Sequence, residues 1–177
     1  MEKLLQLFRK SNAEFLKRDS ELIASGVSER CLCGALMLFL HNTIQKSPFK
    51  DYYADVEYNR NDKRIKTIID DQEYIIPITC DLIVHSRGSI FNQDNLIAIE
   101  MKKSSASFRE KLKDKIRLKA LTRDTFDNMW PYDGKTYPQH VCGYLLGVYY
   151  EINIRSRFID LEYYERGEIV TTERIRF

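Results

Sequence analysis

The stretch from Cys80 to Lys103, which reads CDLIVHSRGSIFNQDNLIAIEMKK, places ionisable groups in two otherwise apolar segments. Asp81 begins the first segment, and Glu100 and Lys102 end the second, after a polar turn. Burying a charge in a strand costs several kcal/mol unless a partner or a metal compensates for it. Three such groups in one short stretch indicate a functional site, and we expect the rest of the chain to form its scaffold.

The composition bounds the class of protein. A chain of 177 residues fits one domain with a substantial core, and a net charge of +2 does not by itself indicate a polyanionic partner. The first residues mix acids and bases without a long apolar run, so we expect neither a signal peptide nor a membrane span. The cysteines form no CxxC pair, which favours reduced, buried thiols and a cytoplasmic location; they are Cys31, Cys33, Cys80 and Cys142.

Three helices are predicted from apolar periodicity. Residues 2–17 form an amphipathic helix within an N-terminal extension, 1–26. Ser28 is a good N-cap for a second, largely apolar helix that runs towards Ile44. The third helix spans about 107–122, with Phe108, Leu112 and Ile116 on one apolar stripe and Leu118 and Leu121 beside it.

Strands are predicted on both sides of the third helix. Residues 55–60 alternate as a half-buried strand does, and residues 64–78 form a hairpin around the polar turn 70–73. The segments that carry Asp81 and Glu100, and a later one within 140–152, are apolar on both faces, as in central strands covered by helices. A core of 27–152 is followed by a C-terminal strand pair, 153–177. The long loop 124–139 holds Trp130, Tyr132 and Tyr137, which cover a core edge or stack on bases or a partner.

The third helix is strongly basic. Between residues 102 and 123 there are nine basic residues and two acidic ones. A charge run of this kind is most often a solvated face, but beside a carboxylate site it also suits phosphate binding, which counterion release drives. The residues that we predict to contact nucleic acid are Lys103, Arg109, Lys111, Lys113, Lys115 and Lys119.

Strand geometry brings the central charges together. Positions i and i+2 share a face, so Glu100 and Lys102 point the same way and Met101 points to the other. If the strand of Asp81 pairs with theirs, two carboxylates and one amine converge. Hard oxygen ligands suit Mg²⁺ or Mn²⁺, and the Met101 carbonyl is an additional candidate ligand. Lys102 would then orient or help to deprotonate a water and stabilise charge on a phosphate, so that the site hydrolyses phosphodiesters.

Other interpretations apply to the spacing of the three central charges and to Glu29. Charged strand ends also occur by chance, so the spacing of Asp81, Glu100 and Lys102 is a loose pattern by itself. Glu29, in the first turn of the second helix, is either an acid favoured by the helix dipole or a carboxylate directed at a metal. The three histidines lack metal spacing, and neither a glycine-rich phosphate loop nor a nucleophile elbow is present.

The segments CDLIVH and IAIEMKK resemble the Asp…Glu-x-Lys core of the PD-(D/E)xK nuclease superfamily. Further similarity to small bacterial members of that superfamily extends over about 28–152, in SER at 28–30, EYNR at 57–60, DLIVHSRG at 81–88, DKIRLKALT at 114–122 and GYLLGVYYE. The resemblance implies an α/β, restriction-endonuclease-like αβββαβ core, with a central mixed sheet flanked by helices and extra C-terminal strands here. It also implies that Glu29 joins the site as a ligand or positions one.

Three hypotheses follow. The first is a Mg²⁺- or Mn²⁺-dependent endonuclease that cleaves nucleic acid, DNA more than RNA, in defence against foreign nucleic acid. The second is a module of the same fold that binds nucleic acid or a partner and cleaves nothing. The third adds a homodimer surface made by Trp130 and the tyrosine-rich C-terminal strands.

Overall fold

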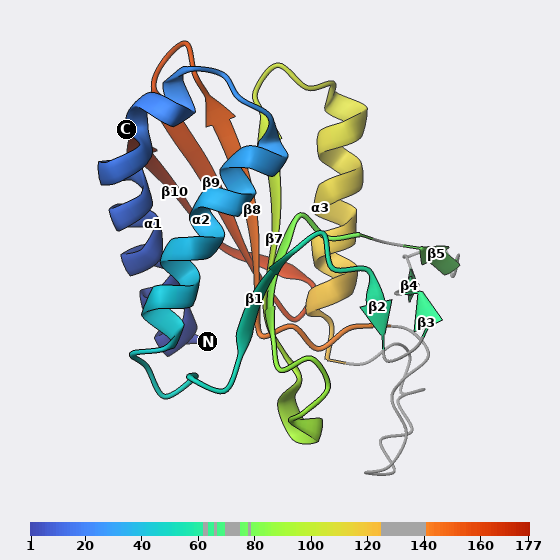
Figure 1. Cartoon of the computed structure of the whole chain (residues 1–177). Helices are drawn as coiled ribbons and strands as arrows, with labels where there is room; N and C mark the ends of the chain where they lie inside the picture. The colour runs from blue at the N-terminus through green and yellow to red at the C-terminus, as the bar shows by residue number, and fades with distance from the viewer. Residues whose placement is uncertain (62–63, 66, 70–74, 78, 125–140) are drawn as a thin grey trace.

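The computed structural model describes residues 1–61, 64–65, 67–69, 75–77, 79–124 and 141–177. The fold is α/β, as expected: a mixed sheet of six strands has helices on both faces (Figure 1). The sheet order is β1-β6-β7-β8-β9-β10. Its strands are β1 Tyr53–Val56, β6 Leu82–His85, β7 Asn95–Lys103, β8 Leu146–Asn153, β9 Phe158–Glu165 and β10 Glu168–Arg176.

The strand register decides where the site lies. Strands β6 and β7 are antiparallel and their pairing ends where Leu82 faces Ile99. Strand β7 continues beyond this point to Lys103, and it pairs there with the parallel strand β8. The last four residues of β7, 100–103, therefore have a strand partner on one side only.

Helices α1 (Glu2–Ala24) and α2 (Glu29–Ile44) cover one face of the sheet. As predicted, the Ser28 side chain caps α2 by accepting a hydrogen bond from the Cys31 N–H at 3.2 Å. Helix α1 is longer than predicted, because it continues through a kink at Asp19. The apolar faces of both helices pack on β6, β7 and β8 in the larger of two hydrophobic clusters.

Helix α3 (Phe108–Thr122) covers the other face and connects β7 to β8. The Ser107 side chain and Glu110 form a capping box at its start. Leu118 and Leu121 are buried against the sheet. The stripe predicted from Phe108, Leu112 and Ile116 is not the packing face: Phe108 is 80% exposed and Leu112 is 43% exposed, because the helix begins beyond the edge of the core.

Short strands lie outside the main sheet. The predicted hairpin is confirmed, since β4 (Thr67–Ile69) pairs antiparallel with β5 (Ile75–Pro77). Its predicted turn, 70–73, lies outside the described residues. Trp130 and most of the predicted loop 124–139 also lie outside them. Strands β2 (Arg60–Asn61) and β3 (Arg64–Ile65) form another pair. The strand predicted at 55–60 instead ends at Val56, and Glu57 turns the chain with φ of 51°.

A polar cluster joins β1 to the end of β6. Nε2 of His85 lies 2.9 Å from Oδ2 of Asp55, and Nε of Arg87 donates to the same oxygen at 2.7 Å. Burial works to raise the pKa of Asp55, but the hydrogen bonds from Arg87 and His85 hold that pKa well below its ordinary value.

The C-terminal strand pair is confirmed: β9 and β10 are antiparallel and extend the same sheet beyond β8. The tyrosines of β8 and β9 are buried and therefore form no exposed surface for a partner; they are Tyr149, Tyr150, Tyr163 and Tyr164. The tyrosine part of the homodimer hypothesis thus has no support within the described residues. No helix in the described part of the chain has the length and hydropathy of a membrane span.

Candidate active site

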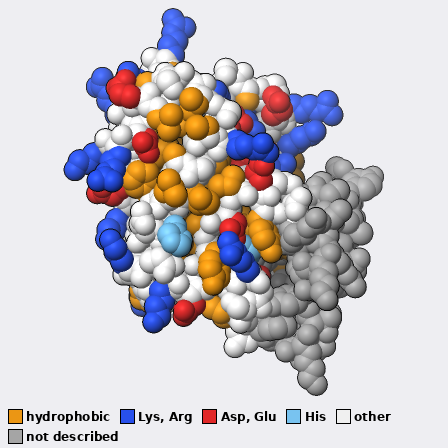
Figure 2. All heavy atoms as spheres, in the orientation of Figure 1, with side chains coloured by type: hydrophobic (Ala, Val, Ile, Leu, Met, Phe, Trp, Pro, Cys, Tyr) orange, Lys and Arg blue, Asp and Glu red, His pale blue; other side chains and the backbone are white. Residues whose placement is uncertain are grey.

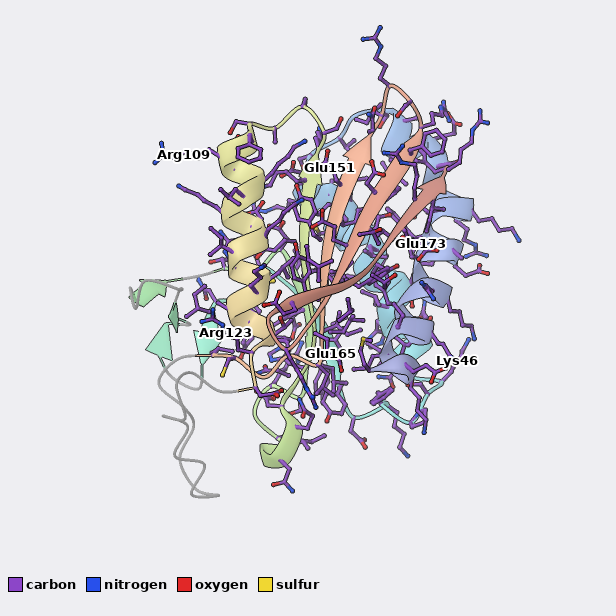
Figure 3. The ribbon with its side chains drawn as sticks, turned by 180° about the vertical axis from the view of Figure 1, so that it is seen from behind. Lys46, Arg109, Arg123, Glu151, Glu165 and Glu173 are labelled. Carbon is purple, nitrogen blue, oxygen red and sulfur yellow. The ribbon has the colours of Figure 1, made fainter. Side chains whose placement is uncertain are left out.

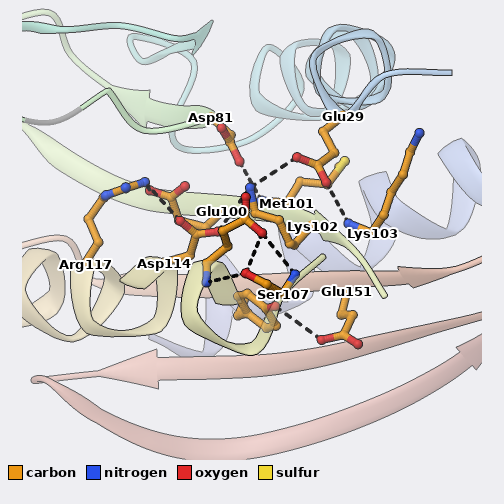
Figure 4. A network of polar contacts seen from close by, with 12 residues as sticks. Glu29, Asp81, Glu100, Met101, Lys102, Lys103, Ser107, Asp114, Arg117 and Glu151 are labelled. Carbon is orange, nitrogen blue, oxygen red and sulfur yellow. Dashed lines mark hydrogen bonds and ion pairs between the residues drawn. The ribbon is translucent and has the colours of Figure 1, made fainter. Parts of the chain in front are cut away.

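The predicted site residues come together at one end of the sheet, where β7 extends beyond β6 (Figure 4). Asp81 directly precedes β6, and Glu100 and Lys102 lie on β7. Glu29 is the first residue of α2. Three parts of the chain, the start of α2, the residue before β6 and the end of β7, thus supply the site, because the N-terminal end of α2 lies at the same end of the sheet as the last residues of β7 (Figure 1).

Two of the acids satisfy the unpaired edge of β7. The Met101 N–H donates to Oδ2 of Asp81 at 2.8 Å, and the Lys103 N–H donates to Oε1 of Glu29 at 2.7 Å. A residue in a strand directs its N–H and C=O to the same side, so the Met101 carbonyl lies on the same edge as Asp81. Charge-assisted hydrogen bonds of this kind are stronger than neutral ones, and they fix both carboxylates beside β7.

Lys102 is held between two acids. Its Nζ lies 3.2 Å from Oε2 of Glu29 and 3.2 Å from Oδ2 of Asp114 on α3. Burial works to lower the pKa of Lys102, but the neighbouring charges of Asp114 and Glu29 outweigh it and raise the pKa above its ordinary value. Lys102 is therefore a fixed positive charge in this arrangement, which suits stabilisation of an anion better than removal of a proton.

Glu100 is the most deeply buried acid of the site, with 1% of its surface exposed. Its Oε1 accepts a hydrogen bond from Nη1 of Arg117 at 2.8 Å, whereas Oε2 is buried and has no hydrogen-bond partner. Burial raises the pKa of Glu100 to about 8, and the nearby charge of Asp81 adds to this effect. Burial also raises the pKa of Asp81. The charge of Asp81 thus disfavours a charge on Glu100, as in sites that take a cation.

Asp114 and Arg117 belong to this network, although their sequence pattern did not identify them as site residues. Nη1 of Arg117 lies 3.4 Å from Oδ1 of Asp114 as well as beside Glu100. Oδ2 of Asp114 is within ion-pair distance of Lys102 but lacks the geometry of a hydrogen bond. A signal was present in the sequence: Asp114 lies four residues before Leu118 and so falls on the helix face that packs on the sheet.

Most of the lysines predicted to contact nucleic acid are ion-paired with the protein. Three of them reach from α3 to acids of the sheet and attach the helix to it: Lys111 Nζ lies 2.7 Å from Glu151, Lys115 Nζ lies 2.6 Å from Glu162 and Lys119 Nζ lies 3.7 Å from Glu168. Nζ of Lys103 donates to the Gly26 carbonyl. Arg109 and Lys113 are exposed and make no ion pair in the described part of the chain; Arg109 projects away from the sheet (Figure 3).

The donor set fits a magnesium ion that takes two carboxylates. The charge of Asp81 raises the cost of charging Glu100, one Glu100 oxygen is unpartnered, and the Met101 carbonyl lies on the same edge as Asp81. Mg²⁺ commonly takes one or two carboxylates and keeps several waters. Among the described residues, no three Asp, Glu, His or Cys side chains group closely enough to hold a metal. Both oxygens of Glu29 contact Lys102 and Lys103, which gives Glu29 a positioning role in this arrangement.

Comparisons of this chain with protein-family models, with curated proteins and with solved structures find no match.

Proposed function

We propose that this protein is a Mg²⁺- or Mn²⁺-dependent nuclease that hydrolyses phosphodiester bonds. One observation carries the proposal: Asp81, Glu100 and Lys102 converge at the free edge of β7, and an oxygen of the buried Glu100 has no partner. The order α2-β1-β6-β7-α3-β8, with β7 and β8 parallel, supports the finer assignment to a restriction-endonuclease-like αβββαβ core. DNA is the preferred substrate in this proposal, with a role in defence.

The residues divide the work in the following way. Asp81 and Glu100, with the Met101 carbonyl, would hold the ion, which when bound lowers the pKa of water and neutralises phosphate charge. Lys102 supplies a second, permanent positive charge beside the scissile phosphate. Glu29 and Asp114 hold its ammonium from two sides at 3.2 Å, so that little reorganisation is needed in the transition state. Arg117 compensates part of the Glu100 charge.

The proposal is tested by incubating the purified protein with DNA and RNA in Mg²⁺, in Mn²⁺ and in a chelator. We expect cleavage in the presence of a metal, and losses of about a hundredfold or more in Asp81→Asn and Lys102→Met, because each removes an electrostatic contribution to the transition state. Lys46→Ala is the matched control, since Lys46 is exposed and lies on the opposite side of the molecule from Arg109 (Figure 3). Cleavage that persists in both site variants, or that is absent on every substrate, contradicts the proposal.

A second candidate function is a module that binds nucleic acid and does not cleave it. The observation that favours it is the ion pair between Arg117 and Glu100, which occupies one of the two candidate metal carboxylates. This candidate predicts binding in a chelator that weakens steeply with salt, and no cleavage with any metal. A homodimer and a cytoplasmic location stay predictions.

A further inference from the structure

Most positive charges of α3 and the strand before it are used within the protein, which makes the free ones informative. Four of the predicted contact residues are taken up by Glu151, Glu162, Glu168 and a backbone carbonyl. Arg109 and Lys113 are exposed without an ion pair in the described part of the chain. They lie four residues apart, so both are on one side of the first turns of α3.

The same turns carry the most exposed large apolar side chain among the described residues. Phe108 is 80% exposed and Leu112, one turn further on, is 43% exposed. A solvated phenylalanine at the start of a helix contributes nothing to the core, and truncating it would cost little stability. Leu38 of α2 is 58% exposed as well. Hydrophobic side chains also gather on the face of the molecule that Figure 2 shows, but charges of both signs surround them.

The start of α3, where these residues lie, is beside the candidate active site. Ser107, which immediately precedes Phe108, caps α3 next to Lys102 and Lys103 (Figure 4). The hydrogen bonds from Ser107 are the main cause that lowers the pKa of Glu110. The charges of Lys102 and Lys113 lower it further. The surface formed by Phe108, Arg109, Leu112 and Lys113, which we call the α3 tip, is therefore continuous with the site.

We propose that the α3 tip binds single-stranded nucleic acid, with an unpaired base stacked on Phe108 and the adjoining phosphates on Arg109 and Lys113. This inference rests on the proposed function, because it names the form of the substrate at the same site. An aromatic ring and free cations in one patch match the two parts of a nucleotide, and base stacking tolerates any sequence because every base has a π-face. A base within a duplex offers no free face, so the α3 tip selects strands with unpaired bases.

Binding is measured by fluorescence anisotropy in a chelator, which separates it from cleavage. We expect Phe108→Ala to weaken binding of a short single strand about tenfold or more, whereas Phe108→Trp retains it. On the same strand with abasic sites, Phe108→Ala and the parent protein should bind equally. Deoxy and ribo strands are compared side by side, and a loss with either supports the proposal and identifies the sugar.

The charged residues have a separate signature. Arg109→Ala and Lys113→Ala should each reduce the slope of log affinity against log salt by about 0.7, whereas Phe108→Ala should leave the slope unchanged. Leu38→Ala is the matched control for loss of an exposed apolar side chain and should bind as the parent does. Circular dichroism should give the same melting temperature for all of these variants, since each changed side chain is exposed.

Three results would overturn the proposal. The first is unchanged affinity in Phe108→Ala, and the second is that Phe108→Ala loses as much affinity for abasic strands as for intact ones. The third is that the parent binds a duplex as tightly as a single strand and that Phe108→Ala weakens both equally. A fourth is a dimer by light scattering that Phe108→Ala converts to a monomer, which would assign the α3 tip to a second copy of the chain. None of these results depends on cleavage. A protein that binds strands as proposed but never cleaves them refutes the nuclease proposal alone.

Discussion

Replacing Glu100 by glutamine should stabilise the protein, and increasingly so as the pH rises. Burial raises the pKa of Glu100 to about 8 in the folded chain, from an ordinary value of 4.5. Between these values the folded state binds more protons at this group than the unfolded state does, so folding loses stability as the pH rises. Glu100→Gln removes that loss because the amide carries no charge at any pH.

The magnitude follows from the size of the shift. Each unit of pKa corresponds to about 1.4 kcal/mol, so the full stability difference between Glu100→Gln and the parent is about 5 kcal/mol. If the protein relaxes so that water reaches the carboxylate, the difference falls to about 2 kcal/mol. Most of this difference should develop between the ordinary pKa of 4.5 and the folded pKa of about 8, and it should level off above the folded pKa. Urea unfolding followed by circular dichroism at a series of pH values, in a chelator, measures it directly.

The control is Glu14→Gln, because Glu14 is exposed on α1 and its substitution should change stability little. A stability difference between Glu100→Gln and the parent that is flat with pH, or that shrinks as the pH rises, would refute the reasoning. Mg²⁺ at high pH provides a second readout: a ligand present at about a hundred times its Kd stabilises the folded state by about 2.7 kcal/mol. The parent should gain this stability and Glu100→Gln should not.

Three further substitutions test the packing and the polar contacts. Gly147→Ala should cost about 1–3 kcal/mol in urea unfolding, because the added methyl group would lie 2.8 Å from the Thr122 methyl group; an unchanged midpoint would contradict this packing. Asp55→Asn should cost about 1.5–3 kcal/mol at neutral pH by loss of charged hydrogen bonds. Because the pKa of Asp55 is lowered by folding, that cost should vanish as the pH falls through the folded pKa, whereas a pH-independent cost would count against it. Asp114→Asn should reduce cleavage about tenfold by loosening Lys102, with kcat affected more than KM; an effect on KM alone would give Asp114 a binding role instead.

Local sequence patterns were sufficient for the elements that carry the site. The Ser28 cap, the apolar central strands and the C-terminal hairpin each have a signal within a few residues, and all three are present in the structure. The convergence of Glu100 and Lys102 on one face also follows from strand periodicity alone. Because these features depend on neighbours along the chain, the sequence by itself determined the α/β class and the core of the candidate site.

The tertiary structure decided which charges face each other. In the sequence, α3 is a run of lysines and arginines with two acids; in the fold, Lys111 and Lys115 meet acids of β8 and β9, and Asp114 and Arg117 complete the site. The position of Phe108, beyond the edge of the core, likewise depends on where α3 begins relative to the sheet. The physical reason is that Coulomb interactions depend on distance in space, and the two acids that hold Lys102 are 12 and 73 residues away from it in the chain.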